Sequence, residues 1–159
     1  MTQPPPLVGR HDPVRLAELK RLCVLDSSPA RAYDDITRLL ATELAVPITM
    51  VNLLDEERDW FKSCFGVQQT QSPAVTSFCE MFFATTADVI VVNDTLLHER
   101  SARHPLVLGR PFIRFYAAAR LVVKGHTVGT LCAYDVALEK SPLTRSCTFS
   151  KWLEQWRNF

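Results

Sequence analysis

Residues 112–135, "FIRFYAAARLVVKGHTVGTLCAYD", hold two long apolar runs separated by Lys124, Gly125 and His126. Glycine adopts the positive φ of a tight turn without steric cost, so Gly125 marks a turn between antiparallel strands. A second glycine, Gly129, lies inside the later run and predicts a point where another backbone or a ligand comes close. The stretch therefore predicts the last β-hairpin of an antiparallel sheet.

The chain before residue 48 has the pattern of two helices. Asp12 is the expected N-cap of the first, and apolar residues follow it at helical spacing. Ser27 or Ser28 is the expected N-cap of the second helix, which Pro47 stops.

Strand and helix patterns alternate after residue 48. The expected elements are a hairpin over 48–55 and 60–66, a loop over 67–76, a short helix over 77–85, a strand over 88–94, a mixed crossover over 95–111, the hairpin described above and a final helix from Pro142. Ser77 is the expected cap of the short helix, with Glu80 completing a capping box. This order predicts an α+β domain in which helices pack on the faces of an antiparallel sheet.

Length and composition favour one globular domain. The chain has 159 residues, of which 47% are hydrophobic, and a formal net charge of +1. We expect a flexible Pro-rich leader over 1–11 and a single domain over 12–159. The balanced charge gives no basic surface for nucleic acid, and no apolar run is long enough to span a membrane. The start, "MTQPPPLVGRHDP", lacks a signal-peptide pattern, so the sequence predicts a cytoplasmic protein.

The cysteines and histidines form no metal or disulfide motif. Five cysteines at wide spacing include no CxxC pair, which favours free thiols that pack as small apolar residues. The four histidines form neither HxxxH nor HExxH, so no metal is expected.

Several short segments, taken in order, resemble the GAF domains of bacterial signalling proteins. These segments are "WFKS", "SFC", "IRFYA" and "GTLC" followed by an aspartate, together with the two-helix lead-in. The resemblance covers roughly residues 12 to 136. It implies a PAS/GAF-like central sheet with helices on both sides, N- and C-terminal helices packed together, and a small-molecule pocket on one sheet face.

The sequence also departs from the GAF pattern. Arg120 stands where many relatives have proline, and Glu80 follows Cys79 where bilin-binding relatives have histidine. No covalent bilin is therefore expected, and the cyclic-nucleotide signature of other GAF domains is missing. The chain ends soon after the domain, so we expect a separate output protein such as a kinase or a cyclase.

The ligand site is predicted on one face of the sheet. Strand period places Arg114 and Tyr116 on the same face, where they would anchor and orient an anionic group. The alternative is that Arg114 pairs with Asp94 and braces the crossover. The predicted ligand-binding residues are Phe78, Cys79, Asp94, Arg114, Tyr116 and Cys132.

Cys79 is the best candidate for a reactive thiol, because a helix N-terminus lowers thiol pKa. Cys132 lies in an apolar strand without a basic neighbour and is expected to line the core or the pocket. A thiol redox enzyme or sensor that uses Cys79 with Cys64 or Cys132 is therefore the alternative function.

The terminal helix carries large apolar residues, Trp152, Leu153 and Trp156. They either cover the domain's own sheet or join the stripe of Leu16, Leu19 and Leu22 in a homodimer interface. The leading hypothesis is a non-enzymatic sensory domain that binds a small ligand and signals as a homodimer. A third possibility is an interaction module whose pocket is collapsed.

Overall fold

The computed structural model describes residues 7–138 and 142–157, and its centre is a six-stranded antiparallel sheet. The strand order is β3-β2-β1-β6-β5-β4. The strands are β1 (Ile48–Leu54), β2 (Arg58–Phe65), β3 (Gln71–Pro73), β4 (Val89–Val92), β5 (Phe115–Val123) and β6 (His126–Asp135). Both predicted hairpins are present, β1 with β2 and β5 with β6, and the α+β class is confirmed.

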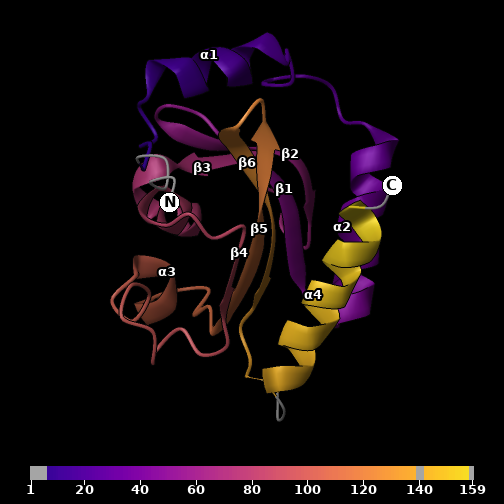
Figure 1. The fold of residues 1–159 in the computed structure, drawn as a ribbon. Helices are drawn as coiled ribbons and strands as arrows, with labels where there is room; N and C mark the ends of the chain where they lie inside the picture. The colour runs from indigo at the N-terminus through magenta and orange to yellow at the C-terminus, as the bar shows by residue number, and fades with distance from the viewer. Residues whose placement is uncertain (1–6, 139–141, 158–159) are drawn as a thin grey trace, which may run out of the picture.

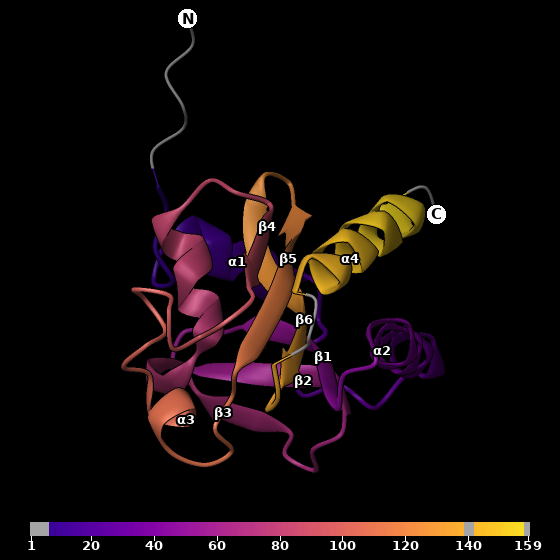
Figure 2. The same cartoon turned by 90° about the horizontal axis from the view of Figure 1, so that it is seen from below.

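Helices cover both faces of this sheet. Figures 1 and 2 show α2 (Arg31–Leu44) and α4 (Pro142–Arg157) side by side on one face. The opposite face carries the short helices η1 (Ala74–Thr76), η2 (Phe78–Ala84) and α3 (Pro105–Leu108). The first helix, α1 (Pro13–Arg21), lies across the end of the sheet and contacts β6 (Figure 1). None of these helices has the length and apolar character needed to cross a membrane.

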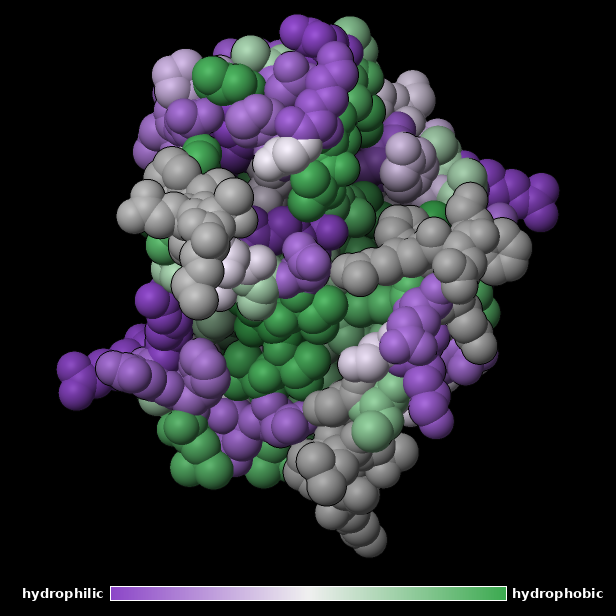
Figure 3. Space-filling view, viewed as in Figure 1, coloured by the Kyte–Doolittle hydropathy of each residue, from purple (hydrophilic) through white to green (hydrophobic). Residues whose placement is uncertain are grey.

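The core on the α2 and α4 side includes the aromatic residues of the last helix. Phe149, Trp152 and Leu153 are buried against α2 and the sheet, so they cover the domain's own core. Val89, Val91 and Leu121 are only partly buried there, and Figure 3 shows apolar surface over β4 and β5. The side chain of Trp156 lies outside the described residues. The homodimer stays a prediction.

The two helix starts that the sequence predicts differ in outcome. Asp12 caps α1 by accepting a hydrogen bond from the Arg15 backbone, as expected. The second helix begins at Arg31 after an Ala30 N-cap, so the prediction of Ser27 or Ser28 is wrong. Ser27 is engaged elsewhere, because its hydroxyl accepts from Lys62 Nζ at 2.8 Å.

Two strand boundaries also differ from the expectation. The expected loop over 67–76 contains β3, a short edge strand whose polar residues and Pro73 conceal it in the sequence. Strand β5 begins at Phe115 rather than at Phe112, whose φ of 62° is incompatible with a strand. The alternation of faces that the sequence predicts therefore does not extend back to Arg114.

The folded part of the chain includes a residue from the expected leader. Arg10 is only 5% exposed, and its guanidinium forms ion pairs with Asp59 and Glu80. The packed chain thus begins two residues before the boundary that the sequence indicates at residue 12.

Candidate functional site

A cavity of about 720 Å³ lies between the sheet and the layer formed by η1, η2 and α3. Strands β1, β2 and β6 form its floor, while residues 67–69 and 106–113 contribute to the opposite wall. Most of its lining is apolar: Ile48, Met50, Phe61, Val67, Phe78, Leu106, Pro111, Ile113 and Tyr134. This combination of an apolar lining and a few polar groups is typical of small-molecule sites.

The buried polar end of the cavity is formed by Asn52, Asp59 and Ser77. Asn52 Nδ2 donates to Asp59 Oδ2 at 3.3 Å and to Cys79 Sγ at 3.7 Å. The Ser77 hydroxyl accepts from the Cys79 backbone N–H at 3.1 Å, and the Ser77 side chain lowers the pKa of Asp59. Strand β1 therefore supplies one polar group among apolar neighbours, and the Ser77 cap of η2 lines the same cavity.

Arg10 neutralises the carboxylate at this end of the cavity. Its Nη2 lies 2.9 Å from Asp59 Oδ1, and both side chains are less than 5% exposed. Burial raises the pKa of Asp59, and the charge of Arg10 opposes that rise. The ion pair thus makes it possible to bury a carboxylate beside the apolar lining.

The structure separates the six predicted ligand residues into three groups. Phe78 lines the cavity, and its ring stacks on His104 with centroids 4.0 Å apart. Cys79, Tyr116 and Cys132 are fully buried and pack in one hydrophobic cluster with Phe78, but they do not line the cavity. Asp94 and Arg114 do not line it either.

Arg114 forms the structural ion pair that was the alternative to a ligand role. Its Nη2 lies 3.2 Å from Asp94 Oδ1, whereas Tyr116 places its hydroxyl 3.3 Å from Cys79 Sγ. The structure therefore does not bring Arg114 and Tyr116 together, because Arg114 precedes the first residue of β5.

The thiols of Cys79 and Cys132 lie on either side of the Thr130 hydroxyl, which is 3.1 Å from Cys79 Sγ and 3.8 Å from Cys132 Sγ. Cys64 is only partly buried against the core and does not line the cavity. Hydrogen bonding from Cys132 lowers the pKa of Cys79, with help from the hydroxyls of Thr130 and Tyr116. Burial raises the pKa of Cys132, and it raises that of Cys64 to about 11. The sequence predicts a low pKa for Cys79, but neighbouring donors rather than a helix N-terminus are the main cause.

The sequence analysis missed Asn52, Asp59 and Arg10. Asn52 gives a usable signal, because it is a polar residue within the apolar strand "ITMVNLLD". A buried polar side chain in such a run needs a partner or a ligand. Asp59 and Arg10 give no such signal, since they are 49 residues apart and only the fold joins them.

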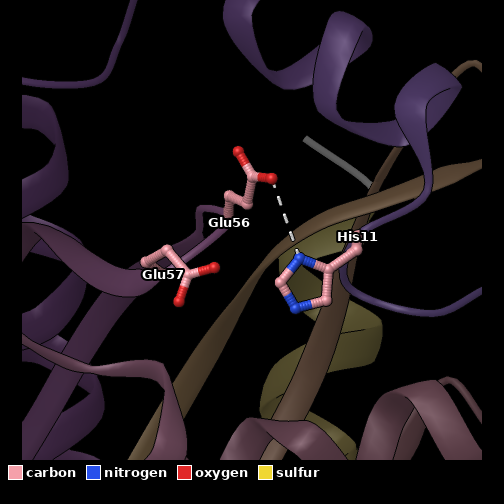
Figure 4. A group of neighbouring side chains, drawn as sticks. All are labelled: His11, Glu56 and Glu57. Atoms are coloured by element: carbon pink, nitrogen blue, oxygen red, sulfur yellow. Dashed lines mark ion pairs between the residues drawn. The ribbon is translucent and has the colours of Figure 1, made fainter.

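An exposed group of potential metal ligands lies at the turn between β1 and β2. His11, Glu56 and Glu57 place ligand atoms within 4.8 Å of one another, with His11 Nδ1 3.8 Å from Glu56 Oε1 (Figure 4). All three side chains are exposed, a setting in which acidic groups are common without a metal. The expectation that no metal binds stays a prediction.

A six-stranded antiparallel sheet with helices on both faces and a cavity against one of them defines a PAS/GAF-like α+β domain. A family model described as the GAF domain matches residues 28–155, and the chain belongs to the GAF domain family. This confirms the family that the sequence resembles.

The chain is similar to one curated protein in sequence and to two solved structures in fold. It is 32% identical over 136 residues to a cyclic di-GMP phosphodiesterase of Pseudomonas aeruginosa, covering 85% of this chain and 23% of that protein. The GAF domain of an Acinetobacter phosphoenolpyruvate-protein phosphotransferase has a TM-score of 0.56 and 13% identity, over 91% of this chain and 90% of that one. The free methionine-R-sulfoxide reductase of Neisseria meningitidis has a TM-score of 0.58 and 15% identity, over 86% and 80%.

These comparisons correct the expectation that the chain is not an enzyme. The curated relative is named a phosphodiesterase, and a solved structure with the same fold is named a reductase. The expectation is wrong because membership of this fold and family does not exclude catalysis. The chain spans about a quarter of the length of the curated relative.

Proposed function

We propose that this GAF domain binds a small molecule in the cavity on the sheet face and thereby regulates a signalling activity. The observation that supports the proposal best is the cavity itself, which has an apolar lining and a buried polar end at Asn52 and Asp59. Regulation is expected because binding near Asp59 would change the surroundings of Arg10, which connects the cavity to the N-terminal segment.

The output of this regulation is proposed from the curated relative. That relative is named a cyclic di-GMP phosphodiesterase. We therefore expect the bound molecule to control cyclic di-GMP turnover. This is tested by a cyclic di-GMP hydrolysis assay of the P. aeruginosa relative, with the segment that matches this chain unchanged and with a tryptophan at its position equivalent to Leu106. We expect the substitution to change the hydrolysis rate, and an unchanged rate would contradict the proposed output.

Filling the cavity is expected to abolish ligand binding. Leu106 lines the cavity from α3, and a Leu106→Trp substitution would place an indole in the space that a ligand needs. Native mass spectrometry of the purified chain reports a bound small molecule as additional mass. We expect to detect this additional mass on the wild-type chain and not on the Leu106→Trp variant.

The matched control is Leu108→Trp, which changes an exposed residue of the same helix that does not line the cavity. This control variant is expected to retain the bound mass. Equal retention by both variants would contradict the proposed site.

A second candidate function is a dithiol that responds to oxidation, because the structure brings Cys79 and Cys132 together. Hydrogen peroxide would oxidise the two thiols to one disulfide, and the peroxide would be reduced to two molecules of water. Burial of both thiols predicts a slow reaction, since the thiolate must be reached by the oxidant.

Peptide mass spectrometry after peroxide treatment tests this candidate. The exposed Cys23 and Cys147 are first replaced by serine to remove competing thiols. We expect a disulfide between Cys79 and Cys132 that also forms in a Cys64→Ser variant. Treatment that leaves both thiols reduced would rule out the dithiol.

A further inference from the structure

We propose that a further cavity, at the end of the sheet where β5 turns into β6, binds a small organic acid through one carboxylate group. This hairpin cavity has a volume of about 410 Å³ and is lined by Arg15 of α1 and by residues within 7–8, 82–88 and 120–127. It shares no lining residue with the cavity on the sheet face. The inference therefore stands apart from the proposed function.

Two arginine side chains of the hairpin cavity converge on Thr127. Arg15 Nη1 donates to the Thr127 carbonyl at 3.2 Å, and Arg120 Nη1 donates to the Thr127 hydroxyl at 2.8 Å. Their other hydrogen bonds go to backbone carbonyl groups, which carry no net charge. Within the described part of the chain, neither guanidinium has a carboxylate at ion-pair distance. The fold thus places two positive charges beside one cavity without an ion pair to either.

The charge of Arg15 is buried. This residue is only 1% exposed, and burial lowers its pKa to about 10, with repulsion from Arg10 adding to the decrease. A buried charge costs free energy unless an opposite charge accompanies it. Arg15 acts on a ligand through its electric field rather than by contact, and this field is screened less inside a protein than in water. An anion in the hairpin cavity would supply the missing opposite charge.

Arg120 presents the group that a carboxylate would contact. It is partly exposed, and its Nη1, which has two N–H groups, has Thr127 Oγ1 as its one acceptor among the described residues. Its guanidinium lies 5.3 Å from the centroid of the Phe82 ring and is fixed by the Phe82 and Thr85 carbonyls at 3.1 and 2.8 Å. A fixed guanidinium matches the planar geometry of a carboxylate. Arg120 is also a residue at which the sequence departs from the GAF pattern, so this site is not expected throughout the family.

The charges of the lining favour a ligand with a single negative charge. Asp88 also lines the hairpin cavity, and its charge acts on Arg120 from beyond ion-pair distance. Two arginines and one aspartate leave a surplus of one positive charge. A monocarboxylate balances this surplus, whereas the dianion of a phosphate monoester exceeds it.

The remaining walls favour an apolar body behind the carboxylate. The apolar residues of the lining are Leu7, Val8, Phe82, Phe83 and Val122. Three of them, Leu7, Val8 and Val122, expose apolar surface that a ligand could cover. The class of ligand is therefore a small aliphatic or aromatic monocarboxylate.

Three probes of nearly the same shape test the charge requirement. Benzoate, benzamide and benzamidine carry one negative charge, no charge and one positive charge on the same ring. Dissociation constants for the wild-type chain are measured by ligand-observed NMR at neutral pH and low ionic strength. We expect benzoate to bind at least about tenfold more tightly than benzamide, because only benzoate brings a negative charge to the two arginines. Benzamidine is expected to bind most weakly.

Two matched substitutions assign the binding to the hairpin cavity. Val122→Glu adds a carboxylate at a half-exposed residue of the lining and is expected to weaken benzoate binding at least about fivefold. Val75→Glu makes the same change at a residue that is 91% exposed and lines neither cavity, so it should leave benzoate binding unchanged. Leu106→Trp, which fills the cavity on the sheet face, should leave it unchanged as well.

Three outcomes would overturn the proposal. Equal binding of benzoate and benzamide would show that the arginine charges do not select the ligand. Loss of benzoate binding in Leu106→Trp would place the ligand in the cavity on the sheet face. Inorganic phosphate that competes as strongly as benzoate would show that an apolar body contributes nothing. The probe ratio of the wild type and the Leu106→Trp control decide the matter even if Val122→Glu does not fold.

Discussion

Replacing Arg10 with alanine is expected to cost about 3–5 kcal/mol of stability at neutral pH, because it leaves the buried carboxylate of Asp59 without its counter-charge. The variant also loses the hydrogen bond from Arg10 Nη1 to the Asp55 carbonyl at 2.7 Å. Urea unfolding of the wild type and the variant measures the difference.

The pH dependence of the stability lost in Arg10→Ala shows whether the unpaired carboxylate of Asp59 causes it. Burial raises the pKa of Asp59, and removing Arg10 takes away the charge that opposes this rise. A carboxyl group whose folded pKa exceeds its unfolded value destabilises the protein as pH rises through those values. The deficit of Arg10→Ala is therefore expected to shrink in mild acid, where Asp59 is protonated.

Two variants serve as controls for this prediction. Arg21→Ala removes an arginine whose side chain is 62% exposed and should change stability by less than about 1 kcal/mol. Adding Asp59→Asn to Arg10→Ala should recover part of the loss. A deficit that is independent of pH and unaffected by Asp59→Asn would contradict this explanation.

Gly129→Ala is expected to destabilise the sheet by about 3 kcal/mol and to weaken ligand binding. A Cβ at this position would lie 2.3 Å from the carbonyl oxygen of Asn52 on the neighbouring strand β1. The strands can relieve this clash only by moving apart where Asn52 contributes to the cavity.

The matched control for Gly129→Ala is Gly125→Ala. Gly125 has a φ of 79°, but a Cβ there would meet no atom within 4 Å. This substitution should cost about 1–2 kcal/mol through the backbone alone and leave ligand binding unchanged. Equal losses of ligand affinity in both variants would show that strand separation is not the cause.

The hairpins and the close approach at Gly129 follow from local patterns, which explains why the sequence predicts them. Turn glycines and strand period act over a few residues, and Gly129 meets the backbone of Asn52 as expected. The Ser77 cap of η2 is predicted for the same reason, since the cap and its partner Cys79 are two residues apart. The prediction that Glu80 completes a capping box is wrong, because its carboxylate pairs with Arg10 instead.

The polar end of the site could not be predicted in the same way. Arg10 reaches Asp59 and Glu80 across 49 and 70 residues, and nothing near Arg10 in sequence indicates burial. Arg114 shows the opposite case, in which a local pattern leads to a wrong prediction. Strand period placed it beside Tyr116, but β5 begins one residue later and Arg114 pairs with Asp94.

The central claim is that small molecules bind in the cavity on the sheet face, and methionine methyl NMR tests it most directly. Met50 lines the cavity, whereas Met81 is buried in the same core cluster without lining it. The chain is labelled with carbon-13 at the methionine methyl groups and titrated with a set of small, mostly apolar fragments that match the cavity lining. We predict that the Met50 resonance moves and saturates while the Met81 resonance stays in place, and that Leu106→Trp abolishes the shift. Resonances of Met50 and Met81 that move equally, or a Met50 resonance that no fragment moves, would contradict the account.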